Sequence, residues 1–174
     1  MHRAFELDPT TRGTRPTHEV LRERYGDGAD VEGMTRRVRE LARADGLDLR
    51  TDQALSANTF DAHRLLAWAQ ATAPEREAAL MDALVRAHFT DLKDVADPEV
   101  LAAAATAAGL DAAAARRVLA SDEFARAVRQ DEAMARELGI HGVPFFVLDG
   151  RVGVSGAQPV EVFRKALRTA LQRA

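Results

Sequence analysis

The chain has 174 residues, of which 47% are hydrophobic and 29% charged, and its formal net charge is −3. That length and apolar content suffice for one domain with a buried core, or for one domain that carries a large insertion. They are not typical of disordered chains. Because acidic and basic residues are interspersed and nearly balanced, the composition argues against a nucleic-acid partner.

Cysteine and long apolar stretches are both missing from the sequence. No apolar run approaches the roughly 20 residues that cross a bilayer, and the start of the chain lacks the apolar stretch of a signal peptide. We therefore expect no membrane partner and a cytoplasmic location. The absence of cysteine removes structural disulfides and reactive thiols alike. Abundant alanine, and only Lys93 and Lys165 among 24 basic residues, suggest a GC-rich bacterial genome.

The N-terminal part begins with an expected strand and continues with helices. Polar and apolar residues alternate over residues 3–7 and predict a short strand that stops at Asp8-Pro9. A polar loop leads to Thr17, and a short helix then ends at Gly26. Asp30 is the expected cap of a second helix. The residues of that helix that we expect to face inward are Met34, Val38, Leu41 and Ala42.

The middle of the chain predicts further helices. Asn58 is an expected N-cap, and the stripe of apolar residues after it comprises Ala62, Leu65, Leu66 and Ala69. Pro74 suits the first turn of the next helix. The face that we expect it to bury carries Met81, Leu84, Val85 and His88. Asp97-Pro98, Asp111 and Ser121 each predict the start of another helix. The last of these carries Phe124, Val128, Ala135 and Leu138.

The pattern changes after Gly142. Residues 145–148 form a compact apolar run, Asp149-Gly150 is typical of a two-residue hairpin turn, and Val152 begins a return strand. Pro159 starts a final helix. The face that we expect this helix to bury carries Val160, Phe163, Leu167 and Leu171. The predicted order is therefore strand, helical block, two strands and helix.

Three segments, in this order along the chain, carry a resemblance to a known family. They are Phe-Glu-Leu-Asp-Pro at 5–9, Asn-Thr-Phe-Asp-Ala-His-Arg at 58–64, and Gly-Val-Pro-Phe-Phe-Val at 142–147 with Ser-Gly-Ala-Gln at 155–158. Together they resemble the FrnE-like branch of the DsbA family. The resemblance implies an α/β, thioredoxin-like and predominantly helical fold. A partial thioredoxin-like domain would comprise residues 1–15 and 140–174, and an inserted helical domain residues 16–139.

The resemblance also implies where a site would lie. Family members begin with a strand and a helix that bears Cys-x-x-Cys, so we expect this chain to be N-terminally truncated, to lack catalytic residues and to be inactive alone. Gly142, Val143 and Pro144 would form a substrate-facing loop for a thiol-containing protein or peptide. A cis bond occurs in only about 5–6% of X-Pro pairs. The local sequence therefore favours trans at Val143-Pro144, whereas the resemblance favours cis.

Other candidate residues have structural explanations beside the functional ones. Ser155, Gly156, Ala157 and Gln158 precede a helix, where free amides favour an anion such as a glutathione carboxylate, although a plain helix cap explains them too. Asn58 and His63 are candidates to line the site, with capping and packing as the alternatives. The histidines and the cluster of Asp91, Asp94 and Asp97 lack the spacing of a metal site, so we expect neither metal nor cofactor apart from glutathione.

Three functions remain open. The first is a thiol-disulfide oxidoreductase of the DsbA/FrnE type that lacks its catalytic cysteines. The second is a non-catalytic thioredoxin-like binding or dimerisation protein, because without a first strand the edge of residues 145–148 lacks a neighbour and a homodimer could form there. The third is a relative of the glutathione-dependent 2-hydroxychromene-2-carboxylate isomerases and kappa-class transferases.

Overall fold

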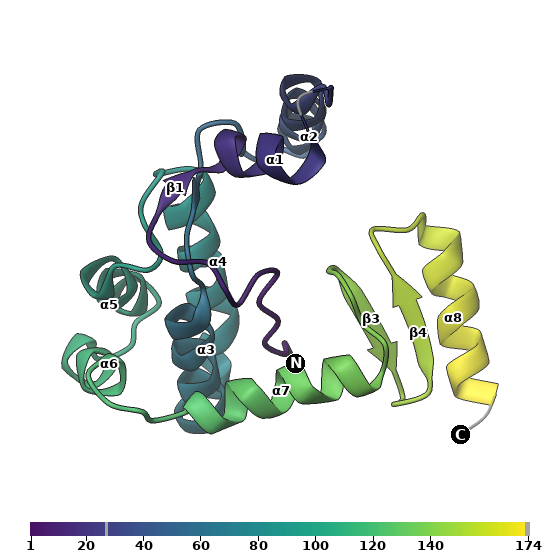
Figure 1. Cartoon of the computed structure of the whole chain (residues 1–174). Helices are drawn as coiled ribbons and strands as arrows, with labels where there is room; N and C mark the ends of the chain where they lie inside the picture. Colours follow the sequence, from purple (N-terminus) through teal and green to yellow (C-terminus); the bar gives the residue numbers. More distant parts are fainter. Residues whose placement is uncertain (27, 173–174) are drawn as a thin grey trace. The chain divides into compact units, whose positions relative to one another are not determined.

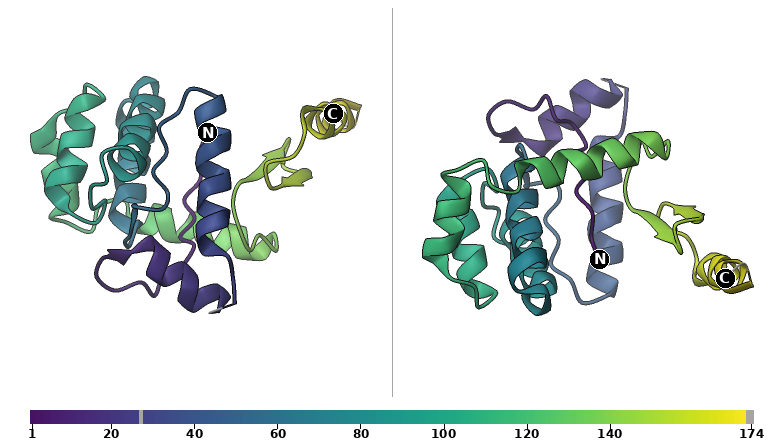
Figure 2. Two further views of the ribbon diagram at one scale, coloured as in Figure 1. Left: turned by 90° about the horizontal axis from the view of Figure 1, so that it is seen from above. Right: turned by 90° about the horizontal axis from the view of Figure 1, so that it is seen from below.

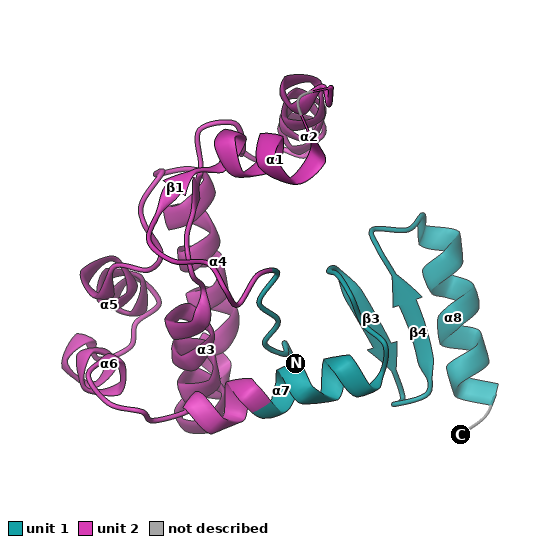
Figure 3. Cartoon of the chain, viewed as in Figure 1, with its two compact units in different colours: residues 1–7, 130–174 teal, residues 8–129 magenta. Residues whose placement is uncertain are grey.

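The computed structural model describes residues 1–26 and 28–172. The chain forms two compact units, which Figure 3 shows in different colours. We call residues 8–129 the helical unit, and residues 1–7 with 130–174 the hairpin unit. The expected domain boundaries after residues 15 and 139 stay a prediction, since this division rests on compactness alone.

The helical unit holds most of the secondary structure. Its elements are β1 (Arg15–Pro16), α1 (Thr17–Tyr25), α2 (Val31–Ala44), β2 (Leu55–Ser56), α3 (Phe60–Thr72), the 3-10 helix η1 (Pro74–Arg76), α4 (Glu77–Phe89), α5 (Pro98–Ala107), α6 (Ala112–Leu119) and the start of α7 (Ala125–Glu137). β1 and β2 pair antiparallel, with Arg15 opposite Ser56. The sequence did not indicate this pair, because two residues are too few to show an alternation.

The core of the helical unit lies among α3, α4, α5 and α6. Leu65, Leu80 and Leu101 are fully buried there. The predicted stripe of α3 is confirmed, since all four of its residues are buried. α5 and α6 lie side by side (Figures 1 and 2), and small alanines on both helices permit that close approach.

Hydrogen bonds confirm most of the predicted helix starts. The carboxylates of Asp30, Asp97 and Asp111 each accept from backbone N–H groups of the first turn of their helix. Asn58 was expected at the N-cap of α3, but Thr59 occupies that position, and Asn58 lies one residue before it, where its Oδ1 accepts from the Phe60 N–H at 2.9 Å. Each start was therefore predictable from local hydrogen bonding.

Two predictions of buried helix faces were only partly right in the helical unit. On α2, Met34, Val38 and Leu41 are exposed, and the buried residues are Val31, Thr35 and Ala42. α2 packs against α1, which covers only one strip of a helix that has apolar residues on two faces. On α4, Leu84 is buried and Met81 packs against the core as predicted, but Val85 is exposed. The residues that α4 buries are Leu80, Leu84 and Ala87.

The predicted start of α7 at Ser121 was also wrong, because the helix begins at Ala125. The buried guanidinium of Arg64 accounts for the difference. It donates to the carbonyl oxygens of Val118, Ser121 and Glu123, so these carbonyls point toward Arg64 and do not begin a helical ladder. Phe124 adopts a φ of 61° directly before the helix. Tertiary hydrogen bonds thus delay the helix by four positions.

The hairpin unit contains the end of α7, then β3 (Phe145–Leu148), β4 (Val152–Ser155) and α8 (Val160–Gln172). β3 and β4 pair antiparallel, with Phe146 opposite Val154. The predicted turn is confirmed: Asp149 and Gly150 have φ of 51° and 64°, and the Arg151 N–H donates to the Leu148 carbonyl at 3.1 Å. α8 lies against the hairpin (Figure 1), where its Phe163 ring meets Phe146 edge to face at 4.9 Å.

One prediction for the hairpin unit was wrong, and another was only partly right. Residues 3–7 do not form a strand, since no described strand pairs with them. Their alternation still buries Ala4 and Glu6, and Asp131 of α7 accepts from the Ala4 N–H at 3.0 Å. On α8 the buried residues are Ala166 and Ala170. Phe163 faces the hairpin as expected, but Val160, Leu167 and Leu171 are exposed, because a two-stranded hairpin covers only a narrow strip of the helix.

Candidate functional site

The loop that enters β3 carries the strongest candidate site. The Val143-Pro144 peptide bond is cis, as the resemblance led us to expect. The Gly156 N–H donates to the Pro144 carbonyl at 2.8 Å and so connects this loop to the end of β4. The Val143 side chain is half exposed. Gly142, Val143 and Pro144 thus present a continuous piece of accessible backbone at one end of the hairpin.

The backbone of Val143 is chemically available. Neither its N–H nor its carbonyl bonds to another described residue. Exposed backbone groups of this kind can pair with an extended peptide, which places the peptide side chains beside the loop. The arrangement can therefore bind and orient a chain, but it offers no nucleophile, since the whole sequence lacks cysteine.

The turn from Ser155 to Gln158 uses several of its own polar groups. The Gly156 N–H is engaged with Pro144, and the Gln158 N–H donates to the Gly156 carbonyl at 3.1 Å. The Gln158 side chain donates to the Ser155 carbonyl at 2.9 Å. Fewer backbone amides are therefore left to bind an anion than the sequence pattern suggests, and the amide of Ala157 is among those left. A glutathione site here stays a prediction.

The other two site candidates belong to the helical unit. Asn58 caps α3 through its Oδ1, and His63 is half-buried on the same helix. Both side chains take part in interactions within the folded chain. Their roles in lining a site stay predictions, and the capping bond already explains why an asparagine stands at position 58.

His88 on α4 is a packing residue. Its ring meets Phe89 edge to face at 4.4 Å, and its Nδ1 has no partner among the described residues. Burial lowers the pKa of His88 below its ordinary value, and the nearby charge of Asp94 opposes that shift only in part. The described residues hold no group of three or more side chains suited to a metal. Asp94 instead accepts hydrogen bonds from the Thr14 hydroxyl, which is distant in sequence, and from the Ala96 N–H within its own turn.

A groove between β4 and α8 was missed by the sequence reasoning. Its volume is about 320 Å³. We call it the β4–α8 groove, and it is lined by Gly153, Val154, Ser155, Gln158, Val162, Lys165, Ala166 and Thr169. The signal that could have found it is the spacing of its four α8 residues, which recur at i, i+3, i+4 and i+7 and so share one helix face.

Comparison with known proteins identifies the family. A family model of the DSBA-like thioredoxin domain matches residues 1–168. The chain belongs to this family. A probable DsbA oxidoreductase from Streptomyces coelicolor has a similar structure, with 43% identity and a TM-score of 0.90 over 99% of this chain and 75% of that chain. No curated protein matches the sequence.

A second solved structure of the DSBA-like fold is more distant. It is a proposed protein disulfide isomerase from Nitrosomonas europaea, with 21% identity and a TM-score of 0.66 over 91% of this chain and 89% of that chain, and it supports the fold alone. The expected DsbA-type, thioredoxin-like and mainly helical fold is confirmed. No described helix is long and apolar enough to cross a membrane.

Proposed function

We propose that this chain is a FrnE-like member of its family and supplies the substrate-facing surface of a thiol-disulfide oxidoreductase. The observation that carries the proposal is the accessible loop of Gly142, Val143 and Pro144, in which the Val143 backbone is free to pair with an extended peptide. The substrate class is a thiol-containing protein or peptide. The membership of the DSBA-like family supports this choice of chemistry.

The chemistry needs a sulfur that these residues do not contain. Thiol-disulfide exchange proceeds by attack of a thiolate on a disulfide sulfur. Because the sequence has no cysteine, the attacking thiolate comes from outside these 174 residues. The role of this chain is then to bind and position the substrate, and a cytoplasmic location stays a prediction.

A direct test is nuclear magnetic resonance of the ¹⁵N-labelled chain with an extended peptide that carries one S-methylated cysteine. We expect the amide signals of Gly142, Val143 and Phe145 to shift on titration. Val143→Asp should weaken binding, because it puts a carboxylate beside the peptide, whereas Val160→Asp on exposed α8 should not. Shifts confined to other residues would contradict the proposal, and shifts at Ser155 to Gln158 with glutathione alone would favour the glutathione-dependent alternative.

The missing thiol gives a second expected outcome. In an insulin-reduction assay with dithiothreitol, this polypeptide should give the same rate as buffer, since it forms no mixed disulfide. The Streptomyces coelicolor relative is a useful comparison in the same assay. Turnover above the buffer rate by the cysteine-free chain would show that our account of its chemistry is wrong.

Dimerisation is the second candidate, and one feature of the hairpin favours it. β3 pairs with β4 on one side only among the described residues, and its Phe146 and Val147 are 41% and 45% exposed. Unpaired edges with apolar side chains recruit further strands. Light scattering after size exclusion should then give the mass of two chains, and Val147→Lys should restore the mass of one. A single-chain mass at all concentrations would exclude this candidate.

A further inference from the structure

The β4–α8 groove combines an apolar floor with a polar rim. Val154, Val162 and Ala166 supply the apolar surface, and Val154 and Ala166 are buried. The polar side chains around it are those of Ser155, Gln158, Lys165 and Thr169. A small number of polar groups over an apolar surface is the usual composition of a binding site, and about 320 Å³ lies at the lower end of the usual range.

The charge at this groove is one-sided. Over residues 140–172 the only carboxylates are Asp149 and Glu161, and each is paired, with Arg151 and Arg164 respectively. Lys165 and Arg168 have no ion-pair partner among the described residues. They lie three positions apart on α8 and are therefore neighbours on the helix surface. Lys165 thus lines the groove as an available cation, Arg168 is a second cation beside it on α8, and no carboxylate among the described residues belongs to the lining.

The strand that borders the groove is also unpaired on one side. β4 pairs with β3, and no other described strand adjoins it. α8 runs beside β4 in Figures 1 and 2, so the space between them is bounded by a strand on one side and a helix on the other. An extended peptide can add to a free strand edge through main-chain hydrogen bonds, while neighbouring side chains select its sequence.

We propose that the β4–α8 groove binds an extended acidic peptide segment, which pairs with the free edge of β4 and places its carboxylates on Lys165 and Arg168. The whole chain carries a formal net charge of −3, so attraction of an acidic peptide depends on this local pair of cations. The inference does not rest on the proposed function, since it needs neither a thiol nor the loop at Val143.

Fluorescence anisotropy with the full chain tests the inference. The probe is the fluorescein-labelled peptide Thr-Glu-Val-Glu-Val-Glu-Thr. Two control peptides replace its glutamates by lysines, or methylate alternate backbone nitrogens so that strand pairing is blocked. We expect binding of the acidic peptide alone, and protection of β4 amides from hydrogen exchange in the complex.

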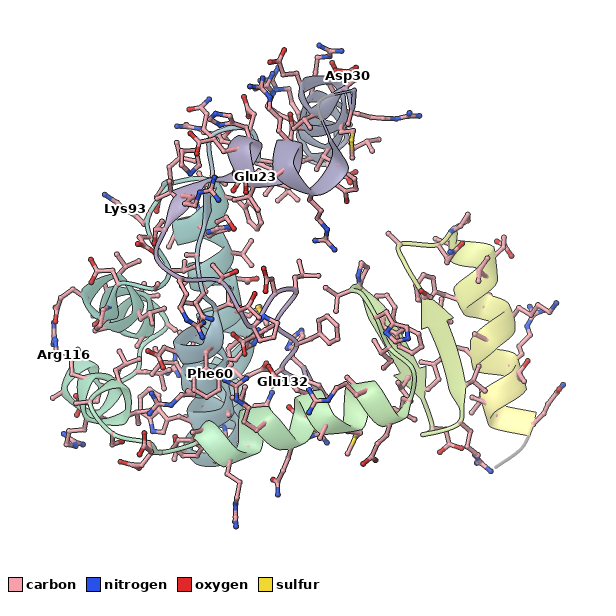
Figure 4. The ribbon with its side chains drawn as sticks, viewed as in Figure 1. Glu23, Asp30, Phe60, Lys93, Arg116 and Glu132 are labelled. Carbon is pink, nitrogen blue, oxygen red and sulfur yellow. The ribbon has the colours of Figure 1, made fainter. Side chains whose placement is uncertain are left out.

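The matched variants reverse one charge each. Lys165→Glu and Arg168→Glu should weaken binding by roughly tenfold or more, because charge-assisted hydrogen bonds are stronger than neutral ones. Lys93→Glu makes the same change at the only other lysine, an exposed residue of the helical unit that points outward in Figure 4, and should leave binding unchanged. Circular dichroism verifies that all variants fold.

Each contrary result overturns a stated part of the inference. Equal binding of the N-methylated peptide would exclude strand pairing. Equal effects of Lys93→Glu and Lys165→Glu would exclude recognition at the groove. Displacement of the peptide by free succinate at equal concentration would show that the site takes small carboxylates and not a peptide. These outcomes do not depend on whether a peptide binds at the Val143 loop. The proposed function and the inference about the β4–α8 groove can therefore be contradicted independently of each other.

Discussion

Arg64 is the buried charge on which the local backbone of the helical unit depends. Its side chain is 5% exposed, forms an ion pair with Asp61 at 2.8 Å and donates to the Glu123 carbonyl at 2.9 Å. Two further carbonyls, of Val118 and Ser121, accept from the same guanidinium. The planar guanidinium has enough N–H donors to bond to all of these oxygens at once, whereas a lysine ammonium does not.

Replacing Arg64 by methionine keeps an unbranched side chain and removes its donors. We expect Arg64→Met to lower the free energy of unfolding by about 3 kcal/mol, because the carbonyls left behind lose their partners in a buried place. Urea denaturation followed by circular dichroism measures the change. Arg37→Met, at an exposed arginine of α2, is the control. Equal stability of the two variants would contradict the assigned role.

His88 makes stability depend on pH. Because burial lowers its pKa in the folded protein, the unfolded chain takes up a proton first as pH falls, and the folded state is then disfavoured. Neutral His88 therefore contributes fully to stability above the unfolded-state pKa of about 6.5. This contribution is lost as the pH falls from that value to the lowered pKa of the folded state. We expect the unfolding free energy to decrease through this window, and the curve of His88→Leu to be flatter. Parallel curves would contradict the prediction.

At the scale of elements, a local cap sets where α5 begins. Asp97 precedes Pro98 at the start of α5, and its carboxylate accepts from the Glu99 N–H at 2.9 Å. Proline at the first helical position needs no hydrogen-bond acceptor, so cap and proline act together. The helix that follows buries Leu101 together with Ala102, Ala104 and Ala105.

The cap of α5 can be tested with two substitutions. Asp97→Ala should destabilise the protein by about 1 kcal/mol, whereas Asp97→Asn should retain nearly all of the stability, because asparagine caps as well as aspartate does. Thermal unfolding by calorimetry gives both values. A loss of the same size in both variants would indicate that the charge of Asp97, and not its hydrogen bond, is what stabilises the helix.

At the scale of the whole molecule, apolar burial is unevenly divided between the two units. Leu101 in the core of the helical unit is fully buried, whereas Leu171 on α8 of the hairpin unit is 76% exposed. The same side chain therefore contributes differently at the two places. Each unit has to be considered with its own core.

This contrast predicts the effect of one substitution at two positions. Leu101→Ala should lower the unfolding free energy by about 2–5 kcal/mol, since it removes buried contacts and leaves a cavity. Leu171→Ala should change it by no more than about 0.5 kcal/mol. Chemical denaturation of the two variants makes the comparison. A large loss at Leu171 would contradict the exposure of this side chain on α8.

Local chemistry was the part that the sequence by itself determined. The cap at Asp97, the apolar stripe of α3 and the Asp149-Gly150 turn each depend on residues a few positions apart, so their spacing was sufficient to predict them. The family resemblance also predicted the loop at Val143 and Pro144, because the segments that carry the resemblance are short and contiguous.

Only the tertiary structure decided which of two apolar faces is buried, where α7 begins and that a groove lies beside β4. α2 and α8 have more apolar surface than their neighbours cover, so their patterns could not tell the inward face from the outward one. The start of α7 depends on Arg64, which is far away in sequence. Burial and long-range hydrogen bonds are properties of neighbours in space, and one-dimensional spacing does not contain them.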